Sequence, residues 1–485
     1  MKIGLVDTMH KGNNRAPNLA IASLAGFLFS RSHEVGILDL YFSGGRDQRR
    51  FLESHWDLIG ITATSFAFPV AQATIREIRL RNPDVPIVLG GPHASIMREQ
   101  LLEKEKELDY AIWGEGEIPL VELAGLLGQG SRPKPQDLVK IPGLIYRVGD
   151  KVAINPPAER IKDLDSLPLP PYHLFPMDRY EIHAIYTSRG CPYACAYCAS
   201  WTIFGRSWVA RSPLKVVEEM EYIIAHWGRK PFALVEDTFN LKTERVKELC
   251  RLIIARKLGI SWRPDGIRAD RVDSEMLDLM KKSGCDSVSV GIESANPEVL
   301  KNIGKGETIV EIREGILKMK SAGLSVCGMF MIGNPGDTLE TIRESIAFAK
   351  SLQLDTVRFY QAVPYPNTRL WTYVEQEGRF LRQDIENIHD FTEEPVFETK
   401  TFPAADRLEA YQLAMPHMFP EGQPGAAALF GPRIIRFVRR LRAEPMPVLF
   451  RAVQRRLRCM ISALRRWKFG GEEAGKLIHT RYSRQ

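Results

Sequence analysis

The sequence is poor in cysteine: seven occur among 485 residues, and none precedes Cys191. So few cysteines in a long chain exclude the small secreted folds that disulfides hold together. Long apolar runs are also missing, since none reaches the roughly 20 residues that a membrane-spanning helix needs. The opening residues MKIGLVDTMHKG lack the charged start, apolar stretch and cleavage site of a secretory signal. We therefore expect a cytoplasmic protein.

The net charge of +7 is unevenly distributed. Residues 433–485 hold fifteen Arg and Lys against three Glu, a balance of +12, which leaves −5 for the rest of the chain. Because the basic character is confined to the C-terminal tail, it does not indicate nucleic-acid binding by the whole protein. A hydrophobic content of 44% and this length predict two or three globular domains.

The first 125 residues predict a Rossmann-like domain. Short apolar strands, in KIGLVDT, EVGILDL, DLIGITATS, VPIVLGG and DYAIWGEGE, alternate with helical patterns over 19–30 and 70–81. This alternation indicates an α/β fold with a parallel, doubly wound sheet, whose ligands lie at the carboxyl ends of the strands. The loops at those ends supply the candidate ligand-binding residues Thr62, Thr64, Ser65, Gly90, Gly91, Pro92, His93, Ala94, Gly114, Glu115 and Gly116.

The run IVLGGPHAS, followed after a helix by DYAIWGEGE, resembles the cobalamin-binding domain that precedes many radical enzymes. The resemblance covers residues 1–125 and implies cobalamin as a cofactor. It departs from D-x-H-x-x-G, whose histidine ligates cobalt from below in cobalamin-dependent mutases and methionine synthase, because Asp7, His10 and Gly12 are spaced differently. We expect no cobalt ligand from that motif, and His93 either touches the cofactor or has a polar role in its loop.

Residues 126–180 are expected to form a linker, with a small hairpin in GLIYRVGDKVAINPP and a proline-rich stretch in DLDSLPLPPYHLFP. Proline lacks an N–H donor and fixes φ, which favours extended connections. We expect this segment to join the two domains and to shape the mouth of the substrate cavity.

Three cysteines fall within eight residues of the segment IYTSRGCPYACAYC, at Cys191, Cys195 and Cys198. This spacing places three thiolates around one centre. Four thiolates would saturate a cubane cluster or a structural zinc ion, whereas three leave one iron open. The alternatives are a zinc site completed by a histidine such as His183, or three unrelated core cysteines. The remaining cysteines, expected to be buried apolar residues, are Cys250, Cys285, Cys327 and Cys459.

In this context the triad resembles the defining motif of the radical S-adenosylmethionine (radical SAM) family, specifically over residues 182–375. The resemblance implies a [4Fe-4S] cluster on the three cysteines, whose open iron chelates the amino and carboxylate groups of S-adenosylmethionine. Downstream, strand patterns alternate with helical patterns over 274–283, 309–322 and 339–352. We expect a partial (β/α)6 barrel over residues 181–400, with its active site at the carboxyl ends of the strands.

Carried over by position, the resemblance implies that residues at the strand ends contact S-adenosylmethionine. These are Tyr197 and Ile332 with Gly333 and Pro335 near the adenine, Glu236 and Asp237 near the amino group or ribose, Arg268 at the carboxylate, and Glu293 at the ribose or methionine. Without such roles the acids would be surface or helix-capping carboxylates, and the arginine a surface residue. Gly190 permits the turn into the cysteine loop, and Tyr365 and Asn367 are expected to line the substrate cavity.

Residues 401–485 are expected to form a basic, helical C-terminal region. Within it, residues 448–468 predict an amphipathic helix: apolar residues recur every three or four positions, at Leu449, Val453, Leu457, Met460, Leu464 and Trp467, while Arg451, Arg455, Arg458 and Arg465 fall elsewhere. Such a helix either lies on the anionic inner face of the membrane or packs on the barrel with a solvated arginine face. The first alternative indicates peripheral membrane contact and a lipid-like substrate.

The two resemblances together imply reductive cleavage of S-adenosylmethionine to a 5′-deoxyadenosyl radical, with an electron from a partner such as flavodoxin or ferredoxin. We predict a cobalamin-dependent C-methyltransferase that acts on an unactivated carbon of a lipid or natural-product intermediate. The alternative is ring closure or rearrangement without methyl transfer. Methylthiolation would need N-terminal cysteines for a second cluster and a C-terminal RNA-binding barrel, and the sequence offers neither. A non-enzymatic corrinoid carrier or sensor would leave the triad and the barrel without purpose.

Overall fold

The computed structural model describes residues 1–8, 16–130, 133–388 and 393–418. All of them belong to the first of two units, Met1–Gly422. His10, Gly12, Cys459 and the predicted basic helix lie outside the described residues. No helix in the described ranges is long and apolar enough to cross a bilayer.

The N-terminal part is a seven-stranded sheet in the order β2-β1-β3-β4-β5-β6-β7. The first five strands pair in parallel: β1 (Lys2–Asp7), β2 (Glu34–Asp39), β3 (Leu58–Thr62), β4 (Ile87–Gly90) and β5 (Tyr110–Ile112). The predicted parallel α/β sheet is therefore confirmed. Its strand order reverses between β1 and β3, and ligands of doubly wound folds bind at such a switch point.

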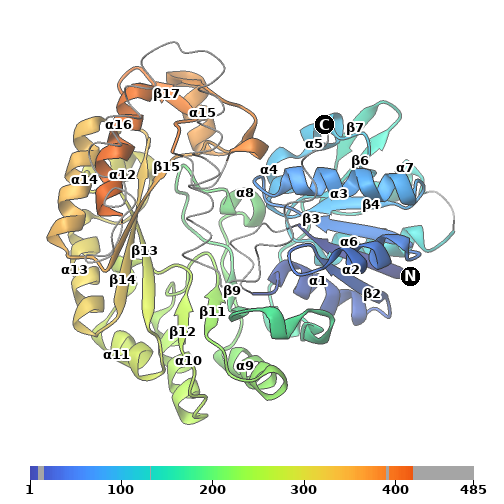
Figure 1. Ribbon diagram of the computed structural model, residues 1–485, viewed down its shortest axis with the longest axis horizontal. Coiled ribbons are helices and arrows are strands. Elements are labelled where there is room, and N and C mark those ends of the chain that lie inside the picture. Colours follow the sequence, from blue (N-terminus) through green and yellow to red (C-terminus); the bar gives the residue numbers. More distant parts are fainter. Residues whose placement is uncertain (9–15, 131–132, 389–392, 419–485) are drawn as a thin grey trace, which may run out of the picture. The chain divides into compact units, whose positions relative to one another are not determined.

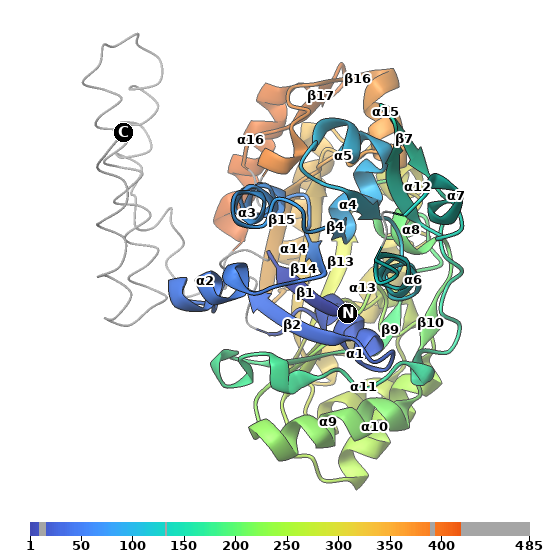
Figure 2. The ribbon, with the colours of Figure 1, turned by 90° about the vertical axis from the view of Figure 1, so that its right-hand side faces the viewer.

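Helices cover this sheet on both faces. They are α1 (Leu19–Phe29), α2 (Gly45–Glu53), α3 (Phe68–Arg81), α4 (Pro92–Met97), α5 (Glu99–Lys104), α6 (Glu117–Leu127) and α7 (Pro135–Leu138). Helix α1 lies beside α6, and α2 lies beside α3 (Figure 2). The helices α1 and α3 match the periodic segments that predicted them, because each places a run of apolar side chains in the core.

The hairpin expected inside the linker belongs to this sheet instead. Strand β6 (Leu144–Val148) pairs antiparallel with β5 and with β7 (Lys151–Ile154), so the sheet continues past residue 125. Without the hairpin, β5 would expose an unpaired edge, and covering that edge satisfies its backbone groups. The rest of the segment crosses to the second domain through three short 3-10 turns, Leu164–Ser166, Tyr172–Leu174 and Met177–Arg179.

The second domain holds six strands that follow one another in space. They are β8 (His183–Tyr186), β11 (Phe232–Val235), β12 (Trp262–Pro264), β13 (Ser287–Glu293), β14 (Ser325–Ile332) and β15 (Thr356–Gln361). Parallel ladders join β8-β11-β12 and β13-β14-β15, and isolated parallel bridges at Trp262–Cys285 and Ile267–Val290 connect the two groups. This arrangement confirms the partial (β/α)6 barrel.

The helices of the barrel lie outside its strands (Figure 1). They are α9 (Pro213–Trp227), α10 (Thr243–Ala255), α11 (Ser274–Lys282), α12 (Pro297–Ile303), α13 (Ile309–Ser321) and α14 (Leu339–Ser351). The barrel is followed by α15 (Arg369–Glu377), the β16 (Gly378–Phe380) and β17 (Phe397–Thr399) hairpin, and α16 (Ala404–Ala414). The predicted helices over 274–283, 309–322 and 339–352 are thus confirmed to within one residue.

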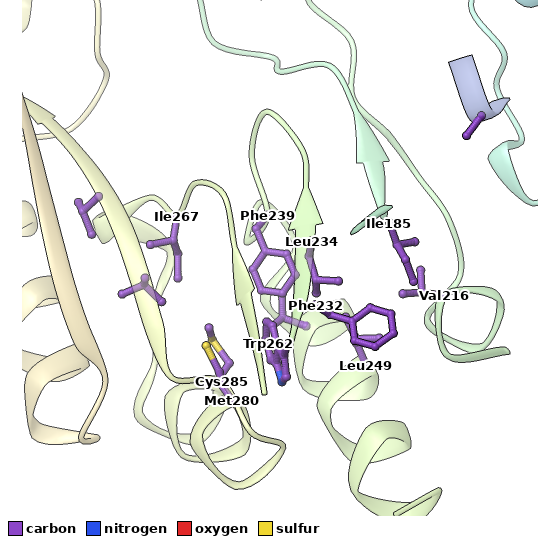
Figure 3. Close-up of a cluster of buried hydrophobic side chains, with 14 of the residues drawn as sticks. Ile185, Val216, Phe232, Leu234, Phe239, Leu249, Trp262, Ile267, Met280 and Cys285 are labelled. Atoms are coloured by element: carbon purple, nitrogen blue, oxygen red, sulfur yellow. The ribbon is translucent and has the colours of Figure 1, made fainter. Parts of the chain in front are cut away.

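Apolar side chains between the strands and these helices form the core of the barrel (Figure 3). Trp262, Phe232 and Phe239 are almost completely buried there. Cys250 and Cys285 are also buried in this core, which confirms that they act as apolar residues. Packing on this side fixes the strands, so that their carboxyl ends hold the polar residues described below.

Candidate active site

The cysteine loop connects the short strand β9 (Ser188–Arg189) to α8 (Ser200–Phe204). Gly190 opens the loop with a φ of +83°, and a Cβ at this position would collide with the carbonyl oxygen of Ser207. The N–H of Gly190 donates a 2.8 Å hydrogen bond to Oδ2 of Asp237. The turn therefore requires glycine and ties the loop to the end of β11.

The thiols of Cys191, Cys195 and Cys198 are half-buried and lie close to one another. Burial raises the pKa of the Cys198 thiol to about 12 and also raises the pKa of Cys195, and the neighbouring Cys191 adds to both shifts. Lys305 opposes the shift at Cys195. Thiols in such surroundings ionise when a metal centre takes the place of their protons.

Two hydrogen bonds reach the sulfurs from outside the triad. Thr238 Oγ1 donates to Cys191 Sγ at 3.2 Å, and the N–H of Ser200 lies 3.4 Å from Cys198 Sγ. Donors of this kind favour the thiolate form that iron binds.

His183 begins β8 at the end of the strand away from the loop, where its Nε2 lies 3.0 Å from the Gly228 carbonyl. It is therefore not placed as a fourth ligand. No group of three metal-ligating side chains is gathered into a metal site within the described residues, so the assignment of a cluster to these thiols rests on their chemistry and spacing.

Tyr197 and Glu293 meet directly. The Tyr197 hydroxyl donates to Oε1 of Glu293 at 2.8 Å, and burial together with this carboxylate raises the pKa of Tyr197 well above its usual range. Glu293 ends β13 with a φ of +68°, where the pairing with β14 shifts register. Its Oε1 also lies 3.5 Å from the Lys305 ammonium. The structure thus brings two predicted cofactor residues together beside the loop.

Arg268 is buried next to the same loop. Its guanidinium lies 3.7 Å above the Tyr193 ring and donates to Asp270 and to the Lys305 carbonyl. These protein partners hold the side chain against the cysteine loop.

Glu236 and Asp237 directly follow β11 and have different surroundings. Oε2 of Glu236 accepts hydrogen bonds of 2.6 Å from Thr187 and Ser188, whereas its buried Oε1 has no hydrogen-bond partner among the described residues. Burial raises the pKa of Glu236. Asp237 is exposed and borders the cavity described next. Ile332 is fully buried at the end of β14.

A cavity of about 460 Å³ lies between the sheet and the barrel. From the sheet side it is lined by residues including Leu5, Ile21, Leu24, Gly60, Thr62, Gly90, Gly91, Pro92, Gly114, Glu115, Gly116, Glu117 and Leu120. From the barrel side it is lined by Tyr186, Arg189, Cys198, Ser200, Ile203, Phe204 and Asp237. One space is therefore bordered both by the carboxyl ends of β3, β4 and β5 and by the last cysteine of the triad.

The sheet side of this cavity is shaped by glycine. Gly91 has a φ of +90°, and a Cβ there would lie 2.6 Å from Thr62 Oγ1. A Cβ at Gly90 would meet nothing within 4 Å. Glycines at these strand ends leave room for a large ligand to approach the backbone, which is what a corrinoid requires.

Comparison with known proteins identifies the family to which the chain belongs. The model "Radical SAM superfamily" matches residues 185–349, and the model "B12 binding domain" matches residues 7–124. The uncharacterized methyltransferase PH0819 of Pyrococcus horikoshii is 34% identical over 397 residues, which cover 80% of this chain and 84% of that protein. The chain belongs to the cobalamin-dependent radical SAM methyltransferases.

Two further comparisons extend this result. The anaerobic magnesium-protoporphyrin IX monomethyl ester cyclase of Rubrivivax gelatinosus is 29% identical over 324 residues, 65% of this chain and 58% of that protein. The structure of TsrM from Kitasatospora setae with cobalamin and a [4Fe-4S] cluster superposes with a TM-score of 0.66 at 23% identity, over 77% of this chain and 78% of that one. This last likeness concerns the fold.

Membership in this family makes the chain an enzyme, and its radical SAM and B12-binding domains imply a [4Fe-4S] cluster, S-adenosylmethionine and cobalamin as cofactors. A corrinoid carrier or sensor without enzymatic activity is excluded. The three thiols on one loop are of the type that the cluster needs, and the glycine-lined end of the sheet leaves space for a large ligand. On the barrel side, the buried Oε1 of Glu236 has no hydrogen-bond partner among the described residues.

Several predicted residues of this radical SAM enzyme lie away from the cavity wall. Thr64 Oγ1 accepts from the N–H of Ala67 at the start of α3. His93, expected in a loop, lies in the first turn of α4. Its ring stacks on Phe68 with 3.9 Å between the ring centroids, and its Nδ1 lies 3.1 Å from Ser65 Oγ. Burial lowers the pKa of His93 to about 3, so the ring is neutral. Pro92 at the start of α4 favours helix there, which explains the difference.

Tyr365 and Asn367 are not among the residues that line the cavity. Asn367 instead donates from Nδ2 to the Ile96 carbonyl at 2.8 Å, with a φ of +65°. This bond joins the segment between β15 and α15 to α4 of the sheet domain. Asn367 thus contributes to the contact between the two domains.

Arg189 is a residue of the site that sequence reasoning missed. Its guanidinium bonds Glu117 at 2.7 Å, Glu115 at 3.2 Å and Ser23 at 2.9 Å, all on the sheet domain. Glu115 also pairs with Arg160 of the connecting segment. The acidic repeat GEGE and the arginine before Gly190 are visible in the sequence as charged residues beside glycines. No spacing rule predicts that Arg189 pairs with Glu117, which is 72 positions away.

Proposed function

We propose that this enzyme methylates an unactivated carbon of a small molecule, a lipid-like or natural-product intermediate. The observation that carries the proposal is the shared cavity, which has Cys198 and Asp237 on one wall and the glycine-rich strand ends on the other. A methyl donor on the sheet side and a hydrogen-abstracting centre on the barrel side would then face one substrate. Radical formation and methyl supply on the two sides of one space are what C-methylation needs.

The cofactors supply the hard chemistry: the cluster with S-adenosylmethionine provides hydrogen-atom abstraction, and cobalamin provides the methyl group. The residues of the chain bind and orient them. We assign the amino group or ribose of S-adenosylmethionine to Glu236 and Asp237, and its carboxylate to Arg268. Glu293 is assigned to the ribose or methionine portion, and Tyr197 with Ile332 to the adenine.

The substrate class rests on the apolar part of the cavity and on one relative. Ile112, Ile203 and Phe204 line the cavity together with the leucines of the sheet domain. The Rubrivivax relative is named as a cyclase of magnesium-protoporphyrin IX monomethyl ester. An apolar cavity favours a substrate with little charge near its reacting carbon. The electron is proposed to come from a flavodoxin or ferredoxin.

The basic tail is proposed to hold the enzyme at an anionic membrane surface, near a lipid-like substrate. This part of the proposal depends on the sequence of residues 433–485. Sedimentation with anionic liposomes tests it. The full chain is expected to sediment and a chain lacking residues 433–485 to stay in the supernatant, whereas equal sedimentation of both would remove the idea.

Stoichiometry tests the reaction. Anaerobically reconstituted enzyme is supplied with cobalamin, a reductant, S-adenosylmethionine labelled in its methyl group, and extract from a strain that lacks the gene. We expect one S-adenosylhomocysteine and one 5′-deoxyadenosine for each labelled product. The Cys198→Ala variant serves as the negative control.

Ring closure or rearrangement is the second candidate, favoured by the likeness to the Rubrivivax cyclase. In that case 5′-deoxyadenosine still forms and a product appears, but the methyl label never enters it. The same experiment therefore separates the two reactions.

A further inference from the structure

The loop Gly304–Glu307 packs against the cysteine loop from the side of the barrel. Ala196 N–H donates to the Ile303 carbonyl at 2.8 Å, and Arg369 bridges the carbonyls of Ala194 and Ile303. Gly304 and Gly306, with φ of +68° and +69°, flank Lys305 on either side. These contacts hold Lys305 beside the segment that carries Cys195.

Lys305 is a buried cation at this point, with a side chain that is 9% exposed. Its ammonium lies 3.5 Å from Glu293 Oε1 and 3.4 Å from Glu307 Oε2. Lys305 is not among the residues lining the cavity between the domains. Its charge is therefore fixed in place by protein groups, with no described contact to the space where a substrate would lie.

Lys305 belongs to a group of two cations and three anions, with a net charge of −1. Arg268 is the second cation, and Glu293, Glu307 and Asp270 are the anions, because Arg268 bonds Asp270 and lies 3.7 Å from Glu307. Removing one charge from this buried group therefore changes the local balance by a full unit. Charges in a site of low dielectric act strongly on a neighbouring centre whose own charge changes.

We propose that the buried ammonium of Lys305 raises the reduction potential of the iron-sulfur cluster held by Cys191, Cys195 and Cys198. The proposal rests on the assignment of the cluster to these cysteines. Reduction adds one electron to the cluster, from the 2+ to the 1+ state, and forms or breaks no bond in the chain. A fixed cation nearby stabilises the reduced state, and net charge around a cluster is an established determinant of its potential.

The test measures the midpoint potential of the reconstituted full-length protein by EPR, in a titration with dithionite and without S-adenosylmethionine. Lys305→Met is expected to shift the midpoint to a more negative value, because it removes a cation. Glu307→Gln is expected to shift it to a more positive value, because it removes an anion with little change of shape. The double variant, which removes both charges, is expected to return to the wild-type value.

Two further variants serve as controls. Lys305→Arg keeps the charge and is expected to keep the wild-type midpoint. Lys301→Met removes a lysine four residues away whose side chain is 77% exposed, and it should leave the midpoint unchanged because solvent screens that charge.

Iron content and circular dichroism establish that each variant is folded and loaded. If Lys305→Met does not take up the cluster, the Glu307→Gln variant alone tests the proposal, through the sign of the shift in its midpoint potential. Unchanged midpoints in both single variants, or shifts in the same direction, would overturn the proposal while leaving the proposed function intact. A wild-type protein that takes up no cluster would instead overturn the proposed function.

Discussion

The hydroxyl of Tyr197 donates a 2.8 Å hydrogen bond to Oε1 of Glu293, across 96 residues of sequence. This bond joins the residue before the last cysteine to the end of β13. It makes the cysteine loop and the far half of the barrel parts of one site. Glu293, with its left-handed backbone and its second partner Lys305, is held in a single orientation.

Glu293→Gln is expected to weaken S-adenosylmethionine binding while leaving the cluster in place. A hydrogen bond to a charged group contributes about 1.5–3 kcal/mol, which corresponds to on the order of 10- to 150-fold in Kd. Titration calorimetry on the reconstituted protein measures the affinity. The exposed Glu298→Gln is the matched control, and equal affinities in both variants would contradict the assignment of Glu293.

Cys198→Ala is expected to abolish assembly of a stable [4Fe-4S] cluster and the reductive cleavage of S-adenosylmethionine. The two remaining thiolates can ligate only two of the three irons that the triad would bind. Iron content, visible absorbance and 5′-deoxyadenosine formation measure the loss. Cys327→Ala, which changes a half-buried cysteine of β14, should retain wild-type iron. Loss of iron in this control would show that the cluster depends on more than the loop.

Arg189→Gln is expected to destabilise the protein by about 3–5 kcal/mol, because it leaves the buried Glu117 carboxylate without its cation. A urea unfolding series measures the change. Arg343→Gln breaks an exposed pair with Glu340 and should cost no more than about 1 kcal/mol. Similar costs for both variants would mean that the interdomain pair does not stabilise the fold.

The same pair predicts an acid dependence of stability. Burial would raise the pKa of Glu117, but Arg189 overcomes burial and holds it below its ordinary value of 4.5. A carboxyl group with a lowered folded pKa stabilises the fold above its unfolded pKa, and this contribution is lost as pH falls through the folded value. The stability difference between wild type and Arg189→Gln should therefore shrink below about pH 4.5. A difference that stays constant down to pH 3, measured by urea unfolding, would speak against this linkage.

Gly90→Ala is expected to weaken cobalamin binding without destabilising the apoprotein. The added methyl group meets no protein atom within 4 Å, so only a ligand in the cavity would collide with it. Overpacking of this kind costs about 1–3 kcal/mol, or roughly 5- to 150-fold in Kd. Absorbance of cobalamin retained after gel filtration measures binding. Gly125→Ala, also without neighbours within 4 Å but on α6, is the control. Unchanged retention by Gly90→Ala would place cobalamin elsewhere.

Local patterns carried most of what could be predicted. The helices over 274–283 and 309–322 follow from apolar periodicity, and the cysteine loop follows from a spacing within eight residues. Pairings between distant segments could not be predicted. The contact of β6 with β5 depends on covering a sheet edge, and the bond between Arg189 and Glu117 depends on how two domains meet. His93 illustrates the same limit, since a polar residue after a glycine pair suggests a loop until its burial against Phe68 is known.

The cavity between the sheet and the barrel has walls that come from opposite ends of a long stretch of chain. Gly90 is synthesised well before Asp237, so the sheet domain leaves the ribosome with only one wall of the cavity formed. A corrinoid captured at that stage would still be exposed to water and oxygen. The order in which the chain is synthesised therefore means that the cavity gains its second wall only when the barrel is complete.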